Sequence, residues 1–150
     1  FWAASKPYLG INWVGLLEVN EHSQKAKLLA DNSGITNVHS ELDLKNNAFG
    51  MDMLKHVKKS RVLTINDVNQ YRLSNGNSRF LRDLHRATLA KNLYVFGLNH
   101  HQQWHGAIMV AHPSASLTPA QLDLLEKISA WMAQHFSRLM SQGLVKDKIA

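Results

Sequence analysis

Nine histidines give this sequence one source of candidate chemistry, because three of them, His100, His101 and His105, lie close together. Imidazole nitrogens are common ligands of transition metals, so this spacing raises a metal site as a hypothesis. No Asp or Glu lies nearby in the sequence to orient an imidazole ring. The surrounding Asn and Gln residues are typical of a solvent-exposed turn. We therefore expect an exposed turn here and assign no metal ligands.

Five further polar residues could hold a small ligand, and each also has a structural interpretation. Asp67 follows a short apolar run, where its carboxylate could accept a hydrogen bond from a ligand or cap a helix or turn. Arg79 and Arg82 could clamp a phosphate or carboxylate through paired hydrogen bonds, or they could form a solvated helix face. His85 and His112 could bind an anionic ligand or a haem iron, or they could be structural. The residues alone leave these alternatives open.

Three aromatic residues complete the candidate binding set. Tyr71, Tyr94 and Phe96 could line a pocket that combines apolar walls with a few polar groups, the usual composition of a ligand site. Alternate residues of a strand point to the same face, so Tyr94, Phe96 and Leu98 could instead be ordinary core. Both interpretations remain open for the two strand residues.

Catalytic motifs are absent from the sequence. It has no nucleophile elbow, no phosphate-binding glycine loop and no helical His-Glu pair. It also has no Cys, which excludes disulfides, zinc-thiolate sites and thiol nucleophiles and favours a cytoplasmic location. We therefore expect a non-catalytic domain.

Charge and length limit the possible partners. The chain of 150 residues suits a single domain. Its net charge of +6 is concentrated between residues 55 and 91, a segment that contains nine basic residues and only two acidic ones. This segment would attract an anionic metabolite, an acidic protein surface or nucleic acid, or it is simply a solvated face. Nucleic acid is the least expected of these partners.

No segment has the length and apolarity of a membrane span. The chain does not begin with Met, which suggests a processed chain or an excised fragment.

Hydrophobic periodicity and turn residues predict an α+β fold. The expected fold is a central antiparallel β-sheet of about five to six strands backed by helices. Residues 35–47 are polar and irregular, and residues 68–77 resemble a loop. The expected strands are 11–20, 25–31, 62–65, 93–98 and 106–112, and the expected helices are 49–59, 78–90 and 118–142.

Several start signals agree on the last helix. Thr118 is a good N-cap, Pro119 suits the first helical position, and Gln121 can complete a capping box. Leu117 and Leu122 stand at the positions of a hydrophobic staple. We expect this helix to begin at Thr118.

The same helix carries two apolar rows. One row can cover a sheet, and the second consists of Leu124, Ile128, Trp131 and His135 with spacings of four, three and four residues. Such spacing is typical of a contact between two helices. It predicts that this helix contacts the same helix of a second copy in a homodimer, although a helix buried deeply in the core would show the same pattern.

Together these motifs resemble a GAF domain over about residues 11–140. The order and spacing of the motifs carry the resemblance, and a PAS-type sensor is the nearest alternative. Gly97 stands where the family usually has Pro. The motifs are Asn12–Leu17, Arg61–Asp67, Phe96–Leu98, His105–Val110 and the helix opening Leu117–Gln121.

The resemblance implies a sensory or regulatory function. GAF domains bind small molecules such as cyclic nucleotides or tetrapyrroles between the sheet and a lid, or they only dimerise. The lack of Cys excludes a covalent bilin and the thiol chemistry of methionine sulfoxide reductases of this fold, whereas haem stays open. We therefore expect residues 1–150 to be one GAF-like domain of a longer signalling protein. It would bind an unidentified small molecule, for which an anion is one candidate, and signal through helix 118–142 to an output domain. A ligand-free dimerisation module is the alternative.

Overall fold

The computed structural model describes residues 13–31, 41–45, 47–59, 62–75, 79–100, 102–113 and 116–141. Side chains are not described at 41, 87, 136, 137 and 139–141. Some of the expectations fall outside the described residues. They concern His101 of the histidine group, the expected end of the last helix at Gln142, and parts of the motifs around Asn12 and Arg61.

Six strands form one antiparallel sheet, which confirms the expected α+β class. The strand order is β3-β2-β1-β6-β5-β4, so the first and last long strands are neighbours at the centre. The strands are β1 (Trp13–Asn20), β2 (Lys25–Asp31), β3 (Glu41–Asp43), β4 (Leu63–Ile65), β5 (Asn92–His100) and β6 (Gln103–His112).

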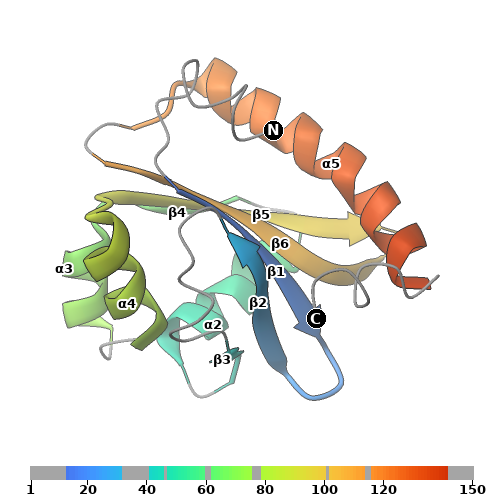
Figure 1. Cartoon of the computed structure of the whole chain (residues 1–150), viewed down its shortest axis with the longest axis horizontal. Coiled ribbons are helices and arrows are strands. Elements are labelled where there is room, and N and C mark those ends of the chain that lie inside the picture. The colour runs from blue at the N-terminus through green and yellow to red at the C-terminus, as the bar shows by residue number, and fades with distance from the viewer. Residues whose placement is uncertain are drawn as a thin grey trace.

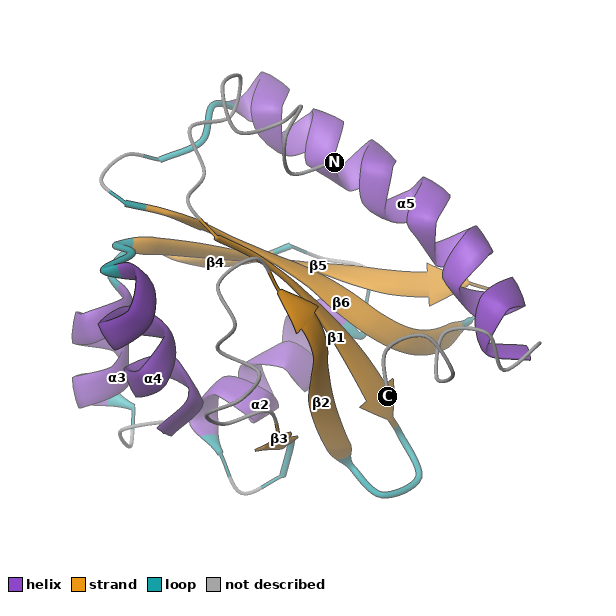
Figure 2. Ribbon diagram, viewed as in Figure 1, coloured by secondary structure: helices purple, strands orange, loops and turns teal. Residues whose placement is uncertain are grey.

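Helices cover both faces of this sheet (Figure 1). Helix α5 (Pro119–Ser141) packs on β5 and β6, and Figure 2 shows the sheet lying between α5 and the other helices. The opposite face carries α2 (Ala48–Asp52), the π-helix η2 (Met53–Val57), α3 (Val68–Ser74) and α4 (Arg79–Thr88). No described helix combines the length and the apolar composition that a membrane span requires.

Two expectations about local structure were wrong. The short strand β3 lies within the segment 35–47 that was expected to be irregular, and it pairs with β2. Helix α3 replaces the expected loop after Asp67. Polar residues obscured this helix, but Asp67 supplies its N-cap, and Val68 anchors it in the core.

Side-chain alternation divides the core into two layers. On β5, Leu93 and Val95 join the layer beneath α2, α3 and α4. Tyr94, Phe96 and Leu98 join the layer beneath α5. The period of two residues along a strand produces this division, because neighbouring side chains point to opposite faces.

The start of α5 has the predicted capping box. The Thr118 amide donates to Gln121 Oε1 at 2.9 Å, and the Gln121 amide donates to Thr118 Oγ1 at 3.2 Å. The helix buries Leu125, Ser129 and Ala133 against the sheet. This packing fixes which side of α5 remains available to solvent or to a partner.

The packing of η2 on β5 explains why glycine stands at position 97, and the sequence alone did not indicate this contact. A Cβ at this position would lie 2.7 Å from the Val57 carbonyl oxygen at the end of η2. The Asn99 side-chain amide donates to that same oxygen at 3.1 Å. The close approach of η2 to β5 therefore requires glycine at 97, and Asn99 satisfies a carbonyl at the helix end.

Candidate functional site

Helices α3 and α4 form the lid, and their attachment to the rest of the domain defines the candidate site. Asp67 Oδ1 accepts a hydrogen bond from the Gln70 amide at 3.0 Å, so this carboxylate caps α3. Asp67 is exposed at the edge of the lid. Of its two proposed roles, the cap is present in the structure, and the role in ligand binding stays a prediction.

Tyr71 joins the lid to α2. Its hydroxyl donates to the Asp52 carboxylate, and its ring packs against the core layer beneath the lid. Burial raises the pKa of Tyr71, and the hydrogen bond and negative charge of Asp52 raise it further. A second connection is the stacked pair Phe49 and Phe80, whose ring centroids lie 6.1 Å apart with an interplanar angle of 13°. The polar contact of Tyr71 and the aromatic contact of Phe80 both attach the lid to α2.

Apolar side chains occupy the region between the lid and the sheet. Val68 of α3 and Phe80, Leu81 and Leu84 of α4 are almost completely buried in one cluster with Leu93 and neighbouring sheet residues. The lid therefore rests on a packed core layer. A ligand that entered between the lid and the sheet would have to displace some of these contacts.

The arginines of α4 lie on the side of the lid that faces away from the sheet. Arg79 and Arg86 are exposed, whereas Phe80 and Leu84 of the same helix face the core. Arg82 is half-buried, and its Nε lies 3.6 Å from Asp83 Oδ1. An anion held by this face would lie on the outer surface of the lid.

The two candidate histidines, His85 of α4 and His112 of β6, both lie near residues 90–92. His85 Nδ1 lies 3.2 Å from the Ala90 carbonyl oxygen, so the tautomer with a proton on Nδ1 donates to that oxygen. His112 ends β6 opposite Asn92, and partial burial lowers its pKa. One ring nitrogen of His85 is therefore engaged within the protein.

Tyr94 and Phe96 face α5 and are separated from the lid by the sheet. The Tyr94 hydroxyl accepts a hydrogen bond from the buried Leu117 amide at 2.9 Å. The eight predicted ligand residues are consequently divided between the two faces, and Tyr71 lies on the lid side. Whether any of them binds a ligand stays a prediction.

The predicted dimer residues form a seam on α5, defined as Leu124, Ile128, Trp131 and His135. Leu124 and Trp131 are exposed, whereas Ile128 and His135 are half-buried. Trp131 is 61% exposed and Leu124 is 39% exposed, although both are large and apolar. The rings of Trp131 and His135 lie 4.2 Å apart between centroids, so one helical turn presents a continuous aromatic surface. The alternative of a helix buried on all sides does not fit these exposures.

His100 and His105 of the histidine group lie beside the β5–β6 turn. His105 is the extra residue of a bulge, since Leu98 pairs with Gly106 and Asn99 pairs with Trp104. Among the residues with described positions, no group of three or more His, Cys, Asp or Glu could hold a metal ion. Burial lowers the pKa of His105, the nearby charge of His100 lowers it further, and Glu21 opposes the shift.

These histidines predict a loss of stability in mild acid. The folded-state pKa values of His105 and His112 lie below the ordinary value of 6.5, so the unfolded chain binds more protons as the pH falls through that value. We expect the free energy of unfolding, measured by urea titration, to decrease from about pH 7.5 to about pH 5.5. Replacing both residues by Gln should reduce this slope. An unchanged slope in the double variant would contradict the assignment.

Comparisons with known proteins support the fold. No protein-family model and no curated protein matched this sequence. The GAF domain/HD domain protein from Geobacter sulfurreducens superposes with a TM-score of 0.70 at 13% identity, covering 92% of this chain and 88% of that chain. A domain of a two-component sensor histidine kinase protein from Sinorhizobium meliloti 1021 gives a TM-score of 0.65 at 12% identity, covering 93% and 88%.

An enzyme is also among the similar structures. The type II free methionine-R-sulfoxide reductase from Thermoplasma acidophilum superposes with a TM-score of 0.61 at 16% identity, covering 99% of this chain and 88% of that chain. At these identities the similarities establish architecture and leave activity open. The sheet order, the helices on both faces and these superpositions together show that the chain has a GAF-like fold.

Proposed function

We propose that this chain is a sensory or regulatory domain that pairs with a second copy of itself through the seam of α5. The observation that carries this proposal is the exposure of Trp131 and Leu124 along one row of a helix whose other side is already packed on the sheet. Large apolar side chains in a row of this kind are unfavourable in water and suit a helix-to-helix contact. A second copy would present the same row, as a two-fold interface requires.

Similar proteins provide a context for this role. The similar structures include a domain of a two-component sensor histidine kinase protein and a GAF domain/HD domain protein. We infer a comparable regulatory role, in which a change within the domain alters how two α5 helices meet. The chain has no Cys, and we therefore assign it no thiol-dependent activity.

Sedimentation velocity over a range of protein concentrations tests the proposed dimer. We expect Trp131→Lys to weaken dimerisation by about 30-fold, since a tryptophan at the centre of an interface contributes about 2 kcal/mol or more. Gln134→Lys adds the same charge to an exposed position of α5 outside the seam and should leave association unchanged. A chain that stays monomeric at every concentration, or a Trp131→Lys variant that dimerises normally, would refute the proposal.

Small-molecule sensing under the lid is the second candidate. It is supported by the position of α3, which is anchored by the fully buried Val68 and joins α2 through the Tyr71–Asp52 hydrogen bond. A ligand would bind one arrangement of residues 66–88 more tightly than another and thereby shift the population. Retention of a small molecule by the purified chain in native mass spectrometry would favour this candidate and identify the ligand class.

A further inference from the structure

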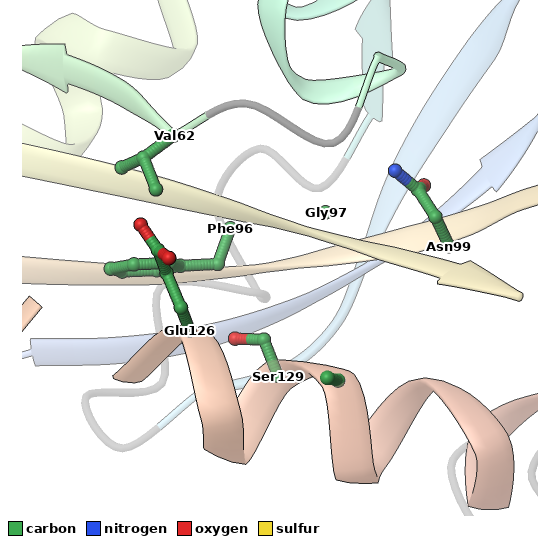
Figure 3. A pocket seen from close by; sticks show the side chains of 7 residues that line it. Val62, Phe96, Gly97, Asn99, Glu126 and Ser129 are labelled. Atoms are coloured by element: carbon green, nitrogen blue, oxygen red, sulfur yellow. The ribbon is translucent and has the colours of Figure 1, made fainter. Parts of the chain in front are cut away.

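A pocket of about 210 Å³ lies between β5 and α5, on the side of the sheet opposite the lid. Figure 3 shows Glu126 and Ser129 extending from α5 toward the strand, where Val62 and Phe96 supply apolar walls. The pocket lies below the range of about 300–1,000 Å³ that is usual for drug-sized ligands. It therefore suits a group about the size of one amino-acid side chain.

The polar groups of this pocket favour a positive charge. Glu126, which is exposed to solvent, contributes a carboxylate, and the almost completely buried Ser129, 4% exposed, contributes a hydroxyl that can accept a hydrogen bond. Asn99 also lines the pocket, and its side-chain amide donates to the Val57 carbonyl oxygen at 3.1 Å. Within the described part of the chain, Glu126 has no ion pair, whereas nearby Asp123 pairs with Lys127 at 2.9 Å. The pocket thus holds an acidic group whose charge is not balanced by a described neighbour.

We propose that this pocket binds a small organic cation, an ammonium or guanidinium group on a short alkyl stem. The Glu126 carboxylate would receive charge-assisted hydrogen bonds from the cation, and the Ser129 hydroxyl would accept another. Val62 and the Phe96 ring would contact the alkyl stem. The pocket and the seam lie on opposite flanks of α5, because Glu126 and Ala130 are on one side and Leu124 and Trp131 are on the other.

NMR titration of the ¹⁵N-labelled chain with n-butylammonium chloride tests this site. We expect saturable shifts of amides around Ser129 and much weaker binding of 1-butanol and sodium butyrate, which carry no positive charge. Glu126→Gln should weaken n-butylammonium binding by about tenfold, as expected for loss of a hydrogen bond to a charged group. Asp123→Asn removes a carboxylate of the same helix outside the pocket and should leave this binding unchanged.

Three outcomes would overturn the proposal. They are the absence of saturable shifts, binding that Glu126→Gln does not weaken, and equal binding of 1-butanol, which would indicate an apolar pocket without charge recognition. Arg61 precedes Val62 in the sequence, so an Arg61→Ala variant is titrated in parallel. Binding by that variant but not by the unmodified chain counts as the first of these outcomes, because the pocket of the unmodified chain would then take no external cation. Sedimentation of Glu126→Gln should match the unmodified chain, so this site and the seam can fail independently.

Discussion

Gly106→Ala is expected to destabilise the domain by about 3 kcal/mol or more, which is a large fraction of the stability of an ordinary domain. A Cβ at Gly106 would lie 2.1 Å from the Leu17 carbonyl oxygen. Both positions belong to the central strands, because β6 pairs with β1 through Glu18 and Gly106. The backbone cannot avoid this oxygen by a change of side-chain rotamer, so the two strands must separate.

Urea unfolding measures this loss directly. Ala30→Gly on an exposed position of β2 is the matched control and should cost about 0.5–1 kcal/mol, the usual effect of glycine in a strand. A Gly106→Ala variant as stable as the unmodified chain would show that β1 and β6 can accommodate a methyl group between them. The short distance between residue 106 and the Leu17 carbonyl oxygen would then not determine the need for glycine.

Phe80→Ala is expected to cost about 3–5 kcal/mol and to loosen the lid. Phe80 is 2% exposed, stacks on Phe49 and belongs to the core layer between the lid and the sheet. Its removal leaves a cavity where α4 meets α2, while the Tyr71–Asp52 hydrogen bond still connects α3 to α2. The lid should then open locally at a lower free energy than the sheet unfolds.

Hydrogen exchange separates this local opening from global unfolding. Amides of α3 and α4 should exchange faster in Phe80→Ala by a larger factor than amides of β5 and β6. Leu73→Ala provides a control on the same lid, since Leu73 is 64% exposed and its replacement should change stability by less than about 0.5 kcal/mol. Uniform acceleration throughout the chain would mean that the lid and the sheet open as one unit.

Local signals predicted much of the fold. Alternation identified the strand pair that became β1 and β2, and turn residues placed the loop between them at Glu21–Gln24. Thr118 and Gln121 predicted the start of α5 because both partners of the capping box lie within four residues. Helix α3 was missed because its polar sequence resembles a loop, and only its N-cap and one buried residue distinguish it.

Long-range geometry explains what could not be predicted of the candidate site. Asp52 and Tyr71 are 19 residues apart, and nothing in their local sequence indicates that they meet. Tyr94 and Phe96 were placed on one strand face, but the face that meets the lid depends on which helices pack on each side of the sheet. Glu126 was not singled out because one acidic residue on a helix resembles ordinary surface.

The pairing of β1 with β6 has a consequence for synthesis on the ribosome. The amino-terminal strand needs residues near 106–111 as its hydrogen-bonding neighbours, so its inner edge stays open until most of the chain has been made. An open strand edge can pair with other chains and promote aggregation. During synthesis this edge of β1 therefore stays unpaired until β6 has left the exit tunnel.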